Sequence, residues 1–134
     1  MTSRPGLRGP VRIASTAVIG EHCTLGYPKE ARLAAAAGGE RDVTAGRPVT
    51  IGERCLLFNH VVIYEGVHIG HDCVIEDRAR IGYDSTIGSR SRIAYGAYLC
   101  DRVTLGSETR IAGFICDGTI IGDRSTVMGE LVHE

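Results

Sequence analysis

The sequence is poor in large aromatic side chains, with no Trp and only two Phe among its 134 residues. A core without such residues must be thin, or must be filled by small aliphatic side chains that repeat. Lysine is nearly missing too, since Lys29 is the single lysine among 15 basic residues. The formal net charge of −1 gives no strong field that would attract nucleic acid or an acidic membrane, so we expect neither partner.

Long apolar runs are also missing. No stretch approaches the ~18 consecutive apolar residues that a membrane-spanning helix needs, and no apolar run follows the polar start as in a secretory signal. The five cysteines include no Cys-x-x-Cys pair, and their odd number disfavours a closed disulfide framework. We therefore expect reduced thiols and a cytoplasmic protein.

What the sequence does contain is a repeat of six residues. An aliphatic residue recurs without a missed step at Ile51, Leu57, Ile63, Ile69, Ile75, Ile81, Ile87, Ile93, Leu99, Leu105 and Ile111. Two residues before each stands a small or β-branched residue, for example Val49, Cys55 and Val61. A spacing of two places both side chains on one face of a strand. Gly often follows, where we expect the chain to turn.

The same pair of positions also appears outside the continuous run. It marks Val11/Ile13, Ala17/Ile19 and Cys23/Leu25, and after a slip near residues 113–118 it returns as Thr119/Ile121 and Ser125/Val127. Each unit is a short strand and a corner, and stacking the units buries an aliphatic column that no single unit could bury.

A longer period of 18 residues aligns Gly52, Gly70, Gly88 and Gly106. Three hexads per turn predict an all-β parallel β-helix with a triangular cross-section and about five to six coils. The four prolines all precede the uninterrupted run, as expected if every later strand donates N–H groups to a neighbour. We predict one domain over residues 1–134, with a first coil at 11–26, an inserted loop at 27–48 and continuous coils at 49–132.

The inserted loop breaks the hexad phase. It holds four alanines at 34–37 followed by two glycines, which predicts a helical turn around 32–37. A lid, an arm that reaches another subunit, and a disordered excursion all remain open for this loop.

Side chains at fixed places in the coil predict two further features. The column of Arg54, Asp72, Arg90 and Glu108 alternates in sign from coil to coil, which indicates a structural ladder of charges. Cysteines at 23, 55 and 73 occupy the small-residue position, which favours packing over reactivity.

The pattern Ile/Leu-Gly-x-x-small-x covers roughly 100 of the 134 residues and resembles that of the hexapeptide-repeat acyltransferases. The resemblance implies a left-handed helix, although parallel crossovers in general favour the right hand. It also implies a homotrimer, a small-molecule acceptor, and acetyl-CoA or another acyl-CoA as co-substrate, bound in clefts between prisms. We expect no metal, and the resemblance places Gly88 and Gly106 at the cofactor.

The stretch His71-Asp72-Cys73 resembles one in the sugar-nucleotide acyltransferases, among them the UDP-N-acetylglucosamine acyltransferases, where the histidine is the general base. Acyl transfer from a thioester needs a base for the acceptor and donors for the oxyanion, and imidazole titrates near neutral pH. Our hypothesis is that Glu53 or Asp72 fixes the His71 tautomer, while backbone N–H groups near Gly82 or Gly88 meet the oxyanion. Substrate-binding roles are predicted for Asn59, His60, His68 and Tyr83.

The sequence thus predicts an acyltransferase, of the acetyltransferase kind, that moves an acyl group from a CoA-type thioester to a hydroxyl or amine of a small acceptor such as a nucleotide sugar. Residues 131–134 end the chain without the C-terminal cap of that superfamily. A non-catalytic trimeric scaffold or a truncated homologue is therefore the alternative. A metal enzyme like the γ-carbonic anhydrases would draw on His60, His68 and His71, but the spacing His68-x-x-His71 differs from that family's.

Overall fold

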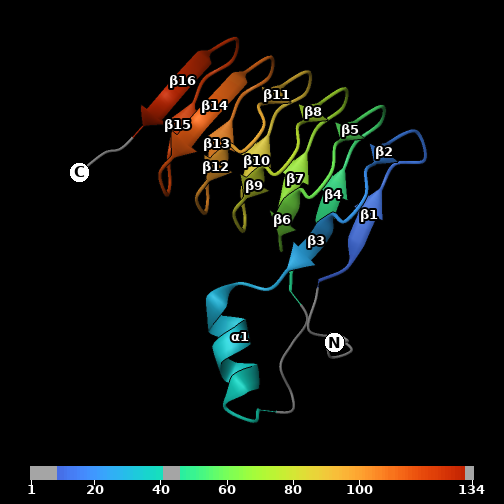
Figure 1. The fold of residues 1–134 in the computed structure, drawn as a ribbon, viewed down its shortest axis with the longest axis vertical. Coiled ribbons are helices and arrows are strands. Elements are labelled where there is room, and N and C mark those ends of the chain that lie inside the picture. Colours follow the sequence, from blue (N-terminus) through green and yellow to red (C-terminus); the bar gives the residue numbers. More distant parts are fainter. Residues whose placement is uncertain (1–8, 41–45, 132–134) are drawn as a thin grey trace.

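The chain forms a three-sided β-helix with one helix beside it (Figure 1). This computed structural model describes residues 9–40 and 46–131. The strands are short because each side of the triangle is only one hexad long, and every strand pair is parallel. The predicted all-β parallel β-helix is confirmed, and the arrangement agrees with the left-handed form.

The first face is a sheet of six stacked strands. In stacking order these are β1 (Val11–Ile13), β4 (Val49–Ile51), β7 (His68–Ile69), β10 (Thr86–Ile87), β13 (Thr104–Leu105) and β15 (Ile120–Ile121). The register pairs residues one coil apart, for example Ile51 with Ile69, so the inward side chains form an unbroken column.

The other two faces belong to one ten-stranded sheet. The second face holds β2 (Val18–Ile19), β5 (Leu56–Leu57), β8 (Val74–Ile75) and β11 (Arg92–Ile93). The third face holds β3 (Thr24–Tyr27), β6 (Val62–Tyr64), β9 (Arg80–Ile81) and β12 (Tyr98–Leu99). Two longer strands, β14 (Arg110–Ile115) and β16 (Thr126–Leu131), continue from the second face onto the third.

These long strands explain the slip in the repeat. The aliphatic step from Ile111 to Ile115 is four residues instead of six, and both side chains are still buried, at 2% and 0% exposure. Gly113 lies opposite Gly129, and both have positive φ values of 101° and 110°. The shortened hexad therefore lets one uninterrupted strand bend from the second face onto the third at Gly113. The pairs predicted after the slip are confirmed by pairing of Leu105 with Ile121 and of Ile111 with Val127.

The core is the predicted aliphatic column together with its small-residue partners. Ile63, Ile75, Ile81 and Ile93 are each 0% exposed, and Cys55 and Cys73 fill the small positions with no exposed surface. Burying an Ile side chain contributes about 1.5–3 kcal/mol, so a stack of such residues holds the coils together without large aromatics.

The corners differ from the prediction that glycines after the aliphatic residues make the turn. The left-handed residue lies two positions later, with φ of 55° at Arg54 and 59° at Asp72. Gly88, in contrast, is needed for stacking, because a Cβ there would lie 2.5 Å from the carbonyl oxygen of Gly106. The glycine column thus permits close approach of successive coils. The residues with positive φ at the corners are mostly not glycine.

The inserted loop contains the helix α1 (Glu30–Ala37), so the predicted helical turn is confirmed and starts slightly earlier. Arg32 of α1 donates two hydrogen bonds to the buried Glu65 carboxylate, from Nε at 2.9 Å and from the terminal nitrogen at 3.2 Å. This pair fixes the helix against the corner that follows β6. Residues 41–45 of the loop lie outside the described part. Among the described residues, no helix is long and apolar enough to cross a membrane.

Candidate functional site

The predicted catalytic histidine lies at the corner that follows β7, which we call the first corner. The backbone N–H of Glu53, one coil earlier, donates to Nδ1 of His71 at 2.9 Å. The backbone N–H of His71 in turn donates to Oγ of Ser89 at 3.0 Å. An acceptor at Nδ1 must be unprotonated, so the neutral ring carries its proton on Nε2.

The same hydrogen bond recurs at other corners with other side chains. The backbone N–H of Ser107 donates to Asp123 at 2.8 Å, and that of Glu21 donates to Asn59 at 2.8 Å. The N–H of Tyr83 likewise donates to Asp101 at 3.2 Å. His71 therefore occupies a position that generally satisfies a corner amide of the preceding coil. The sequence contains a signal for this structural role, because this position of the hexad is rich in Asn, Asp and Ser.

The predicted orienting carboxylates do not contact the ring. The Glu53 side chain accepts a hydrogen bond from the hydroxyl of Thr16, and Asp72 accepts two from Arg54, at 2.8 Å and 3.1 Å. Hydrogen bonding to Arg54 lowers the pKa of Asp72, and its attraction to that cation acts in the same direction. In this structure the acceptor nitrogen of the ring is met by the backbone of Glu53 and not by either carboxylate, and the role of Glu53 and Asp72 stays a prediction.

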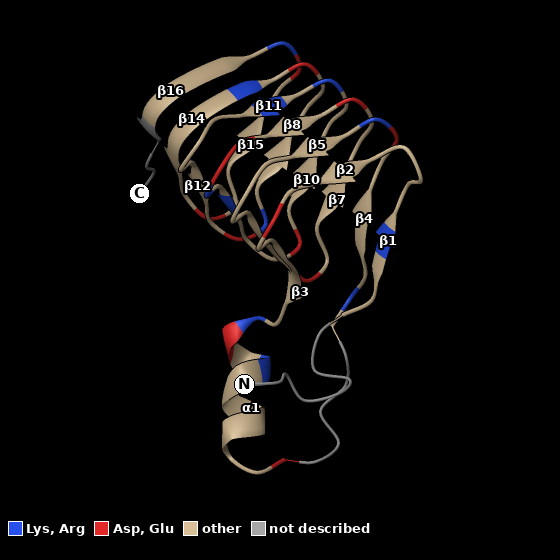
Figure 2. Cartoon of the chain, turned by 45° about the vertical axis from the view of Figure 1, so that its right-hand side comes forward, with Lys and Arg blue, Asp and Glu red and all other residues tan. Residues whose placement is uncertain are grey.

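The predicted charge ladder is formed along this first corner. Arg54 lies 2.8 Å from Asp72, and Arg90 lies 3.6 Å from Glu108. Figure 2 shows the resulting alternation of blue and red along the corners beside β5, β8, β11 and β14. These pairs are exposed, so each contributes little to stability.

The remaining predicted residues are spread around the prism. His68 is exposed on the first face, between Thr50 and Thr86 of the neighbouring strands. Asn59 and His60 lie at the second corner, after β5, where the His60 ring stacks on His22 at 5.1 Å. Tyr83 lies at the third corner, after β9. Within one chain the structure therefore does not bring His71, His60 and Tyr83 together.

The cofactor residues predicted from the resemblance lie on the first corner. Gly88 and Gly106 stack there directly, in the coils that follow His71. They lie at the same corner as His71, and their role at the cofactor stays a prediction. As for metals, no three His, Cys, Asp or Glu side chains are grouped to hold an ion within the described ranges of this single chain.

Sequence reasoning missed a pocket at the third corner, between α1 and the third face. We call it the loop pocket, and its volume is about 230 Å³. Its walls are Pro28, Lys29, Glu30, Leu33, Tyr64, Arg80, Tyr83 and Asp101. No sequence pattern predicts this pocket, because the pocket forms only when α1 packs against the prism.

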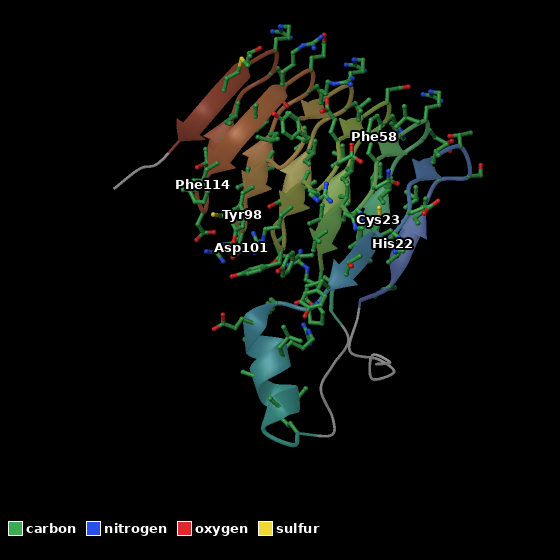
Figure 3. The ribbon with its side chains drawn as sticks, viewed as in Figure 1. His22, Cys23, Phe58, Tyr98, Asp101 and Phe114 are labelled. Atoms are coloured by element: carbon green, nitrogen blue, oxygen red, sulfur yellow. The ribbon has the colours of Figure 1, made fainter. Side chains whose placement is uncertain are left out.

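One wall of this pocket contains Tyr64 and Arg80, which belong to a row of stacked side chains on the third face. The Arg80 guanidinium lies between the rings of Tyr64 and Tyr98, 4.4 Å and 4.5 Å from their centroids. Tyr98 also stacks on Phe114 at 5.5 Å, and Figure 3 shows these two rings on neighbouring strands near Asp101. A terminal nitrogen of Arg80 donates to the Leu99 carbonyl at 2.8 Å. The guanidinium is therefore held in one orientation.

Two family models match the repeat region. Residues 48–83 match bacterial transferase hexapeptide (six repeats), and residues 78–108 match hexapeptide repeat of succinyl-transferase. No curated protein matches the sequence significantly.

Solved structures with a similar course of the chain include three bacterial proteins. The acetyltransferase domain of PglB from Neisseria gonorrhoeae shares 19% identity at a TM-score of 0.48, with 87% of this chain and 56% of that chain covered. A variant of perosamine N-acetyltransferase from Caulobacter crescentus, in complex with CoA and GDP-perosamine, shares 14% at 0.47, with coverages of 91% and 54%. A hexapeptide transferase family protein from Anaplasma phagocytophilum shares 16% at 0.34, with coverages of 95% and 81%. The chain spans about half the length of the first two.

The matched segments coincide with the coils in which every aliphatic position is buried. The resemblance to the hexapeptide-repeat acyltransferases is thereby confirmed, and residues 48–108 of this chain carry the hexapeptide repeat of the bacterial transferases.

Proposed function

We propose that this protein is an acyltransferase, of the acetyltransferase kind, that uses acetyl-CoA or a related acyl-CoA. The acceptor would be a hydroxyl or amine of a small molecule such as a nucleotide sugar. The match of residues 48–108 to transferase repeat models carries the proposal. In the reaction the carbonyl carbon forms a bond to the acceptor oxygen or nitrogen, the carbon–sulfur bond breaks, and the acceptor's proton ends on the CoA thiol.

The geometry at the first corner changes the role proposed for His71. A base at Nε2 would need the proton on Nδ1, where it would face the N–H of Glu53. The neutral ring with Nε2–H is instead a hydrogen-bond donor, suited to the oxyanion that develops on the thioester carbonyl. We therefore propose His71 as that donor, with Gly88 and Gly106 beside the bound thioester.

Assembly into a homotrimer belongs to the same proposal. In one chain the residues predicted to bind substrate lie at different corners, so His60 or Tyr83 of one copy could meet His71 only across an interface. Light scattering on the purified chain tests this directly. A monomer with full transferase activity would contradict the shared site.

The activity test is incubation with acetyl-CoA and a panel of nucleotide sugars, with the acetylated product detected by mass spectrometry. The key variant is His71→Asn, because Asn59, at the equivalent position of the second corner, shows that a side-chain amide can accept such a backbone hydrogen bond. We expect this variant to stay folded and to lose about 10²-fold or more in turnover, as for removal of an oxyanion donor. The matched control is Asp77→Asn, which keeps an acceptor for the Asn59 backbone amide at the second corner.

Two results would contradict the proposal. Failure of acetyl-CoA to bind, measured by calorimetry, would favour the non-catalytic scaffold. Unchanged turnover in a folded His71→Asn protein would leave the activity standing but would remove His71 from it.

A further inference from the structure

The loop pocket is a preformed binding site. Its outer wall, α1, is fixed by the two hydrogen bonds from Arg32 to the buried Glu65, and its inner wall is a β-strand face. A ligand entering it does not have to order the helix first. Sites of this kind lose little affinity to conformational ordering.

The size of the loop pocket limits what it can hold. Its volume of about 230 Å³ is below the range of about 300–1,000 Å³ typical for drug-sized ligands. It therefore fits a single six-membered ring with its substituents, and a whole coenzyme A molecule is far too large.

The charges that line the pocket have both signs. Lys29 and Arg80 contribute cations, and Glu30 and Asp101 contribute carboxylates, of which Arg80 and Asp101 lie 3.7 Å apart as an ion pair. A simple anion would be attracted by the first pair and repelled by the second. An apolar ligand would remove charged groups from water without replacing their hydrogen bonds, which is costly. A hydroxyl group both donates and accepts, so a polyhydroxylated ring can satisfy all of these groups.

The other lining residues are apolar or aromatic. Pro28 and Leu33 offer aliphatic surface, and Tyr64 and Tyr83 offer ring edges and faces. A pyranose has an apolar C–H surface beside its hydroxyl groups, so this combination matches it on both counts. The Lys29 ammonium lies 5.5 Å from the centroid of the Tyr83 ring, so a cation and an aromatic ring lie side by side in the lining.

We propose that the loop pocket binds the pyranose ring of a monosaccharide. Arg80 and Lys29 donate to its hydroxyl oxygens, Asp101 and Glu30 accept from its hydroxyl groups, and Tyr64 or Tyr83 contacts its C–H face. The measurements below detect sugar binding itself, so they need no acyl transfer. With about a dozen non-hydrogen atoms in the ligand, millimolar affinity is expected.

The single lysine gives a direct test. Reductive methylation of Lys29 in the full chain is followed by peptide mass spectrometry with and without ligand. The probes are methyl glycosides of glucose, galactose and N-acetylglucosamine, which have no free amine and whose blocked anomeric carbon cannot react with Lys29. We expect at least one glycoside to slow methylation by about fivefold near saturation, since labelling then reports the unbound fraction. Inorganic phosphate and benzoate, as a simple anion and an apolar ring, should not protect.

Variants locate the bound sugar. Arg80→Met should abolish the protection, whereas Arg92→Met should keep it, because Arg92 pairs with Glu76 on the second face. Ligand-observed NMR on Lys29→Met and Asp101→Asn measures binding without the labelling reaction and covers the case in which Arg80→Met fails to fold. Protection by phosphate or benzoate alone, by no glycoside at all, or equal loss in Arg92→Met would each overturn the proposal.

Discussion

The backbone N–H of Glu53 donates to Nδ1 of His71 across one coil at 2.9 Å. A residue predicted to be catalytic is thus part of the hydrogen-bonded corner structure. The amide would be unpaired if the imidazole turned away, and an unsatisfied backbone donor costs about 1–3 kcal/mol where water does not replace the bond. The orientation of the ring is therefore set by the fold, before any ligand binds.

The tautomer of His71 follows from this contact. We expect the neutral ring to carry its proton on Nε2, with Nδ1 unprotonated, because Nδ1 accepts the Glu53 amide. A long-range ¹H–¹⁵N correlation spectrum recorded at alkaline pH distinguishes the two nitrogens. His68 is the internal control, since it is exposed on the first face. A majority of the Nδ1–H form at His71 would contradict the donor role.

The coil could be predicted from the sequence because the residues that form it recur at a fixed, short period. Each rung from Ile51 to Ile111 falls where the period of six puts it, and the register pairs Ile51 with Ile69 as the 18-residue period requires. The position of the left-handed residue was not readable. Arg, Asp, His and Glu all occupy it, and they accept φ near +60° because the strands on either side hold the ends of the corner.

The candidate site was predictable only in part. The His71 position could be named, but its partner is a backbone amide, which no residue type reveals. The loop pocket could not be predicted from the sequence, for a different reason. It depends on Arg32, in the inserted loop, meeting Glu65, which lies 33 residues later, and such a tertiary contact leaves no periodic signal.

Substitutions at two glycines test whether a glycine at this position is needed for the close stacking of successive coils. Gly88→Ala would place a Cβ 2.5 Å from the Gly106 carbonyl oxygen, whereas a Cβ on Gly122 meets nothing within 4 Å. We expect Gly88→Ala to lower the free energy of unfolding by about 1–3 kcal/mol or more, because backbone cannot yield as a side chain can. Gly122→Ala should stay within about 0.5 kcal/mol. Urea denaturation measures both, and equal losses would contradict the stacking role.

The pair of Asp72 and Arg54 predicts a small dependence of stability on acid pH. The hydrogen bonds from Arg54 lower the pKa of the Asp72 carboxyl in the folded state. The stability that this carboxylate contributes is therefore present above the unfolded pKa of about 3.9 and disappears as the pH falls through the folded pKa. Asp72→Asn should therefore be less stable than the native chain at neutral pH and equal to it at the acid end. Asn tolerates the φ of 59° found at this corner, so the backbone is kept.

Chemical denaturation at a series of pH values gives the difference curve for this pair. Glu108→Gln is the control in the same column, because its carboxylate lies farther from its partner Arg90, at 3.6 Å. A stability difference for Asp72→Asn that grows toward low pH would have the wrong sign and would refute the assignment.

The contact between Arg32 and Glu65 should decide whether the loop pocket exists in solution. Removing one partner of a buried ion pair costs about 3–5 kcal/mol, and an isolated helix of this length is marginal in water. We expect Arg32→Met to release α1, so that amide hydrogen exchange over residues 30–37 becomes more than about tenfold faster while the prism strands keep their protection.

Arg47→Met is the matched control, because Arg47 pairs with Asp84 at 3.5 Å and is 71% exposed. The double variant Arg32→Met/Glu65→Met leaves no unpaired charge, and slow exchange there would show that the helix also docks through apolar contacts. Unchanged exchange in Arg32→Met alone would show that the pair does not hold the helix, and the pocket would then need another support.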